Sequence, residues 1–107
     1  GHEHVARYVP EPIDAAVFNL GWLPGGDKSV TTRVETTLAA LDACLGLLKR
    51  RGLLTVCAYP GHAEGEEELQ AITAWARALP EDFQAMTRAF LNPARPAPTL
   101  VAVQRIR

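Results

Sequence analysis

Four short apolar segments in this chain are separated by longer stretches, two of which repeat their apolar positions every three or four residues. The apolar segments are residues 13–18, 53–59, 83–91 and 100–106. The first two are nearly continuous apolar runs, a pattern typical of strands that are covered on both faces in a parallel sheet. The pattern therefore predicts four strands.

The stretch between the first two predicted strands has the spacing of an amphipathic helix. Thr32 and Glu35 form a capping box at its start, and Gly52 follows a basic triplet, residues 49–51, that suits the negative end of a helix dipole. The expected buried stripe consists of Val34, Leu38, Leu41, Leu45 and Leu48. We expect this helix to end at Gly52.

A second helix is predicted between residues 66 and 80. Three glutamates at residues 66–68 favour its start, and Pro80 favours its end. Its expected stripe consists of Leu69, Ile72, Ala76 and Leu79, with Trp75 beside it.

The order of the elements predicts an α/β fold. Strand, helix, strand, helix, strand favours parallel crossovers. The last connection, residues 92–98, is rich in proline and too short for a parallel crossover, which needs about a dozen residues. We therefore expect a mostly parallel sheet whose final strand is antiparallel, in one domain over residues 1–107.

Composition and charge limit the partners. The chain has 107 residues, of which 48% are apolar and 21% charged, as in one globular domain. The net charge of −1 gives no overall attraction to a polyanion, so contact with nucleic acid requires a local basic patch. The candidates are Lys49, Arg50, Arg51, Arg88, Arg95, Arg105 and Arg107. The alternative is that these residues are solvated ends of helices and strands.

The cysteines and histidines predict no metal site. Cys44 and Cys57 have neither the spacing of a disulfide framework nor that of a zinc site, and His2, His4 and His62 do not complete one. We expect the cysteines to be small buried hydrophobes in a reducing compartment. No run approaches the roughly 20 apolar residues of a membrane span. The start lacks a secretory signal. We expect a cytoplasmic chain without membrane contact.

Polar and aromatic residues follow the first predicted strand, at the position where open α/β sheets bind ligands. Asn19 offers an amide acceptor, Gly21 allows close approach of the backbone, and Trp22 offers a flat face. An amide acceptor with backbone carbonyls suits an amine or ring nitrogen, and an aromatic side chain stacks on a base. The alternative is an Asx-turn at Asn19, with Trp22 closing the core.

The second predicted strand ends in a similar way, in residues 59–62, whose sequence is YPGH. If the two strands are parallel, His62 lies within reach of the loop after Asn19. An imidazole there suits a proton acceptor or a hydrogen-bond partner of the substrate. The alternative is that His62 caps the next helix.

A third candidate site lies at the entrance of the first helix. Lys28, Ser29, Thr31 and Thr32 place one cation and three hydroxyl groups where free N–H groups favour an anion such as phosphate or carboxylate. The alternative is simple capping. No glycine-rich phosphate loop is present in the sequence.

Several motifs resemble one known family when read together. They are residues 18–28 (FNLGWLPGGDK), Thr36 and Thr37, residues 59–62 followed by Gly65 and Glu68, and residues 90–92 (FLN). In this order they resemble the putative rRNA methylase family of class I S-adenosylmethionine-dependent methyltransferases, over nearly the whole chain. The resemblance implies a Rossmann-like sheet with strand order 3-2-1-4-5-7-6, of which this chain supplies strands 4, 5, 6 and 7. It is therefore similar to the C-terminal half, without the glycine-rich loop and acidic residue that hold the cofactor.

The resemblance also implies a reaction. Members of the family are similar to enzymes that methylate the aminomethyl group of a wobble uridine, so we expect S-adenosylmethionine as cofactor and tRNA, rather than rRNA, as substrate. Residues 19–22 match the motif that reads Asn or Asp, Pro, Pro, aromatic in amino-methyltransferases. Leu20 and Gly21 stand in place of both prolines.

Together with the chemistry of the residues, the resemblance implies roles for six of the candidates. Asn19 and Leu20 are the expected cofactor-binding residues, and Asn19 and His62 the expected catalytic ones. Asn19 and the Leu20 carbonyl would hold the amine beside the cofactor, and His62 would orient the substrate or take up a proton. Trp22 would stack on a base, Lys28 would approach a phosphate, and Asn92 would help close the site, unless Asn92 is simply a turn residue. The complete expected substrate-binding set is Leu20, Gly21, Trp22, Pro24, Lys28, Thr32, Tyr59 and Asn92.

A second hypothesis concerns the chain as it stands. Without strand 1 beside it, strand 4 has an unpaired apolar edge, which is a template for pairing with another chain. The alternative function is therefore a non-catalytic half-domain that self-associates, as a homodimer through this edge, and does not bind the cofactor alone.

Overall fold

The computed structural model describes residues 12–20, 30–59, 63–92 and 97–107. Within these residues, strands and helices follow one another in the predicted order. They are β1 (Ile13–Leu20), α2 (Val30–Leu47), β2 (Leu48–Ala58), α3 (Ala63–Arg77), β3 (Phe83–Arg88) and β4 (Thr99–Arg105). The fold is α/β, as the sequence predicts.

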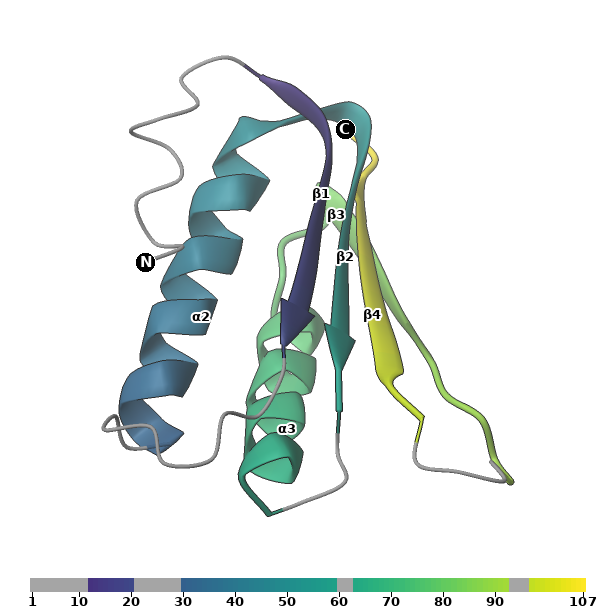
Figure 1. Ribbon diagram of the computed structural model, residues 1–107. Helices are drawn as coiled ribbons and strands as arrows, with labels where there is room; N and C mark the ends of the chain where they lie inside the picture. Colours follow the sequence, from purple (N-terminus) through teal and green to yellow (C-terminus); the bar gives the residue numbers. More distant parts are fainter. Residues whose placement is uncertain (1–11, 21–29, 60–62, 93–96) are drawn as a thin grey trace.

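The described strands form one mixed sheet in the order β1-β2-β4-β3. β1 pairs with β2 in parallel, which confirms that prediction. β4 lies between β2 and β3 and is antiparallel to both, which confirms the predicted direction of the last strand. β1, β2 and β3 therefore run in the same direction, so their carboxyl ends lie at one end of the sheet (Figure 1). We call this end the carboxyl rim.

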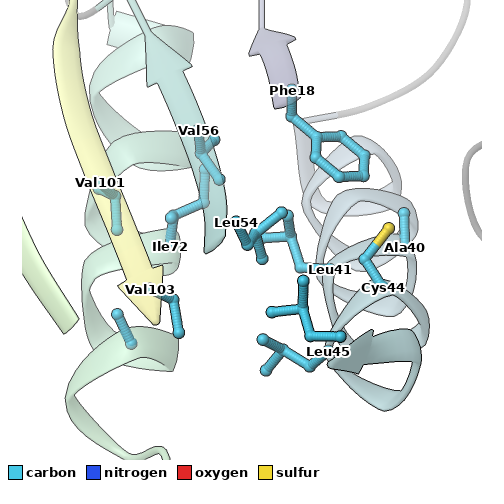
Figure 2. Packing of buried hydrophobic residues seen from close by; sticks show 12 residues of the cluster. Phe18, Ala40, Leu41, Cys44, Leu45, Leu54, Val56, Ile72, Val101 and Val103 are labelled. Atoms are coloured by element: carbon cyan, nitrogen blue, oxygen red, sulfur yellow. The ribbon is translucent and has the colours of Figure 1, made fainter. Parts of the chain in front are cut away.

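Both described helices pack on the same face of the sheet, which we call the helix face (Figure 1). Figure 2 shows apolar side chains of the sheet and of the two helices meeting in one cluster. The buried members are Phe18, Ala40, Leu41, Cys44, Leu45, Leu48, Leu54, Val56, Ile72, Ala76, Val101 and Val103. The Trp75 indole Nε1 also donates a hydrogen bond to Asp42 Oδ1 at 2.8 Å, which joins α3 to α2. In the described part of the chain, neither helix is long and apolar enough to span a bilayer.

The opposite face of the sheet, which we call the open face, is not covered by any described element. In a strand, alternate side chains point to opposite faces. Phe18 is buried on the helix face, whereas its neighbours Val17 and Asn19 are exposed. Val17 remains 67% exposed although it is apolar. The prediction that the first strand is covered on both faces is therefore wrong for the structure described.

The boundaries of α2 also differ from prediction. The helix begins at Val30, before the predicted cap Thr32, and ends at Leu47 instead of Gly52. Leu48 and the basic triplet belong to β2. Leu48 is fully buried, as its helical spacing predicted, but as a strand residue that pairs with Ile13. Pairing across the sheet replaces the last predicted helical turn.

The other boundaries shift by less. α3 ends at Arg77, before Pro80, and β3 ends at Arg88, before the predicted residue 91. Of the two cysteines, both unpaired, Cys44 is buried and Cys57 is only half-buried. Burial raises the pKa of the Cys44 thiol, so this side chain behaves as a small hydrophobe, as expected.

Gly52 lies where β2 passes very close to other backbone. A Cβ there would lie 2.7 Å from the Lys49 carbonyl oxygen and 3.1 Å from that of Asp14. We expect Gly52→Ala to lower the free energy of unfolding by about 1–3 kcal/mol, because backbone must move to admit the methyl group. Gly46→Ala is the matched control, since a Cβ there meets nothing within 4 Å and the residue is in α2.

Urea denaturation of both variants measures these effects. Gly46→Ala is expected to raise the free energy of unfolding by about 0.5–1 kcal/mol, because alanine loses less conformational freedom in a helix. Equal stability of the two variants would contradict the close approach at Gly52.

Candidate functional site

The candidate site is built on the carboxyl ends of β1 and β2, which lie side by side. In the parallel register, Asn19 is paired with Cys57, and Leu20 with Ala58. The two strand ends therefore meet at the carboxyl rim (Figure 1), as the sequence predicts. This is where ligands bind in open α/β sheets.

Asn19 points to the open face of the sheet. Its neighbour Phe18 is 7% exposed and belongs to the core, so the alternation of the strand directs Asn19 the other way. The Asn19 side chain is exposed. Its carboxamide has one acceptor oxygen and two N–H donors for a ligand. The structure thus makes the amide acceptor of the sequence prediction accessible.

Leu20 and Tyr59 extend the same rim. The Leu20 side chain packs against the core, so its backbone carbonyl is the group that suits the predicted role. Tyr59 directly follows β2 and is 49% exposed. Its ring therefore lies at the surface beside the strand end, as a substrate-binding residue requires.

Cys57 is a neighbour of Asn19 that the sequence pattern does not predict. It lies opposite Asn19 in the parallel pair and opposite Leu100 in the antiparallel pair. The same alternation places these three side chains together on the open face. The alternation of residues 55, 57 and 59 with the buried positions 54, 56 and 58 indicates the face on which Cys57 lies. The sequence does not indicate the register of β1 and β2, which makes Cys57 the neighbour of Asn19.

Asn92 lies farther from Asn19 than the predicted set implies. It is exposed in the connection between β3 and β4. β3 ends at the same rim as β2, but β4 lies between those two strands. The structure therefore places Asn92 at the carboxyl rim but not next to β1.

The remaining predicted site residues lie outside the part of the chain that the structure describes. These are Gly21, Trp22, Pro24, Lys28 and His62. Thr32 lies within the backbone of α2, in its first turn. Within the described residues there is no group of metal-binding side chains.

Most of the predicted basic candidates lie at the other end of the sheet. Lys49 Nζ is 3.7 Å from Asp14 Oδ1, and Arg107 is paired with Glu81. The Arg105 guanidinium donates a hydrogen bond of 2.6 Å to the Leu48 carbonyl. These cations stabilise the start of β2 and the end of β4. They do not form a patch beside Asn19.

The sequence of this chain is similar to that of a known protein family and to that of a plant protein. The model of the family described as "Putative rRNA methylase" matches residues 1–104. A tRNA (mnm(5)s(2)U34)-methyltransferase, chloroplastic, from Arabidopsis thaliana is 43% identical over 81 residues, which are 74% of this chain and 30% of that protein.

Solved structures share the architecture. A putative rRNA-methylase from Clostridium thermocellum superposes with a TM-score of 0.85 and 36% identity, covering 99% of this chain and 57% of that one. A putative methyltransferase from Streptococcus mutans in complex with SAH has a TM-score of 0.80 and 31% identity, covering 99% of this chain and 58% of that one. This chain thus spans just over half of these structures and less of the plant relative. It belongs to the putative rRNA methylase family of methyltransferases.

Proposed function

We propose that this chain is part of an S-adenosylmethionine-dependent methyltransferase that methylates the amine of an aminomethyl-uridine in tRNA. The tRNA specificity in the name of the plant relative supports a tRNA substrate, and the SAH in the Streptococcus mutans structure supports the cofactor. The observation that carries the proposal is the exposed Asn19 carboxamide at the joined ends of parallel β1 and β2.

The residues at this rim suit a positively charged cofactor and an amine substrate. Asn19 and the Leu20 carbonyl are neutral acceptors, and no cation is found among the described residues 19–20 and 57–59. A cation there would repel the sulfonium. When bound, S-adenosylmethionine supplies an electrophilic methyl group on positively charged sulfur.

The two acceptors match the hydrogens of a primary amine. A neutral amine has two N–H donors and one lone pair. If the Asn19 Oδ1 atom and the Leu20 carbonyl each accept one N–H, the lone pair is left free for the methyl carbon. The nitrogen then forms the N–C bond as the C–S bond breaks, and the product amine releases one proton. His62 is our candidate acceptor for that proton.

Alignment is the main contribution of the protein to this reaction. Holding a nucleophile in a near-attack position replaces an encounter in solution by a step within one complex. Tyr59 is exposed at the same rim, and we assign it the role of confining the uracil ring by stacking.

A second candidate function is a self-associating half-domain that does not bind the cofactor alone. Among the described strands, β1 is an edge strand with a partner only on its β2 side. Val17 of this strand is exposed on the open face beside the unpaired edge. Such an edge is a template for pairing with a second copy of the chain.

One experiment separates the two functions. S-adenosylmethionine is titrated against this chain and against an extended protein, in which this chain is joined to the part of the Clostridium thermocellum relative that lies outside the match. Methyl transfer is then measured on RNA with and without an aminomethyl-uridine.

The methyltransferase proposal expects the extended protein to bind the cofactor and to methylate only the amine-bearing RNA. Binding by the extended protein alone, together with dimers of the short chain in sedimentation, supports the half-domain as the state of the short chain. Methylation of unmodified uridine would overturn the proposed substrate.

A further inference from the structure

The connection between β3 and β4 presents apolar side chains that the core does not use. Phe90 is 66% exposed and Leu91 is 101% exposed, whereas Phe18 in the core is 7% exposed. They are adjacent residues in the segment that follows β3. Single exposed apolar residues are ordinary, but a contiguous aromatic and aliphatic pair on a projecting segment indicates a contact site.

This pair lies at the same end of the molecule as the candidate site. β3 runs in the same direction as β1 and β2, so the chain leaves β3 at the carboxyl rim. Figure 1 shows the segment after β3 extending past the start of β4 and away from the helices. The segment and Asn19 thus lie at the same rim, with the ends of β2 and β4 between them.

A cation stands at the base of the segment. Arg88 is the last residue of β3 and is exposed on the open face, where it pairs in register with Leu100. Among the described residues Arg88 has no ion-pair partner, in contrast to Lys49 and Arg107 at the other end of the sheet. Arg88 and the exposed Phe90 are thus two residues apart at the carboxyl rim.

We propose that Arg88, Phe90 and Leu91 form an RNA-docking finger that binds the nucleotides next to the methylated one. This inference rests on the proposed function. The Phe90 ring stacks on an unpaired base, Leu91 covers the sugar or base beside it, and the Arg88 guanidinium contacts a phosphate. Single-stranded loops are recognised in this way, because their bases are free to stack on aromatic side chains. The charge of Arg88 favours a polyanion over an apolar protein surface as the occupant.

The test uses the extended protein and an RNA hairpin with the aminomethyl-uridine in its loop. We expect Phe90→Ala to weaken RNA binding by about 10-fold, as loss of one stacked base does. Phe90→Trp should retain binding. The matched control is Ile106→Ala, which removes another exposed apolar side chain, 40% exposed, that follows β4 at the opposite end of the sheet from the finger. It should bind RNA normally.

Two further readouts separate a docking role from a structural one. Arg88→Ala should reduce the dependence of log affinity on log salt by about 0.7, the value for one contact to single-stranded phosphate. Affinity for S-adenosylmethionine and the rate at saturating RNA should not change in either variant, since the finger does not reach the reacting atoms.

The outcomes distinguish this inference from the proposed function. If the unsubstituted protein methylates the RNA but Phe90→Ala binds it equally well, the finger is wrong and the function stands. If the unsubstituted protein neither binds nor methylates the RNA, both are wrong. If Phe90→Ala changes the oligomeric state or the free energy of unfolding in place of RNA affinity, the pair is covered by protein and the finger is again wrong.

Discussion

Replacing Asn19 by alanine in the extended protein is expected to slow methyl transfer to the amine by about 100-fold, the cost of losing alignment of a reacting group. The carboxamide is exposed at the end of β1 and its neighbour Phe18 fills the core, so the substitution removes an acceptor without opening a cavity. Affinity for S-adenosylmethionine should be nearly unchanged. Single-turnover rates and cofactor titration measure the two effects separately.

Two control variants sharpen this result. Cys57→Ala alters the residue paired with Asn19 on the same face and should leave the rate close to that of the unsubstituted protein. Asn19→Asp retains an acceptor but adds a negative charge, which favours the protonated amine. It should therefore be slow at neutral pH and recover as the pH rises. An unchanged rate in Asn19→Ala would remove this residue from the mechanism.

The position of the candidate site at the end of β1 can be predicted from the sequence because the end of a strand is a local feature. The apolar run that ends in Phe18 and the polar residue Asn19 after it are both visible without coordinates. Parallel pairing then follows from the intervening helix. The identity of the residue paired with Asn19 cannot be predicted in this way, because its pairing with Cys57 depends on the register of two strands far apart in sequence.

The end of α2 was mispredicted for a similar reason. Leu48 has the spacing of a helical stripe and is buried, so local periodicity cannot distinguish its helical from its extended state. Its pairing with Ile13 decides the matter. Two residues near the start of β2 have special backbone requirements. Arg51 has a φ of 71°, in the left-handed region, and Gly52 lies so close to other backbone that a Cβ would not fit there.

The covering of the sheet was also mispredicted. A run such as residues 53–58 shows which side chains are suited to burial, but not which elements are present to bury them. Leu54 and Val56 are buried under the helices, whereas Leu53 is partly exposed on the open face. The apolar residues of the open face thus remain suited to a covering element that the described residues do not provide.

Leu53 and Leu54 test this view directly, because they are adjacent on β2 and face opposite ways. Leu54 is fully buried, so we expect Leu54→Ala to lower the free energy of unfolding by about 2–5 kcal/mol through lost burial and the cavity left behind. Leu53 is 41% exposed in this chain, so Leu53→Ala should cost less than about 1 kcal/mol. Urea denaturation at fixed protein concentration measures both.

Repeating the pair in the extended protein shows whether the open face is covered there. Leu54→Ala should cost the same in both proteins, because its helix-face neighbours are already present. If the added segment covers the open face, the cost of Leu53→Ala should rise toward that of Leu54→Ala, because the same side chain is then withdrawn from water. An equal, small cost of Leu53→Ala in both proteins would show that this face stays in solvent, and the apolar residues on it would then have to serve a partner outside the chain.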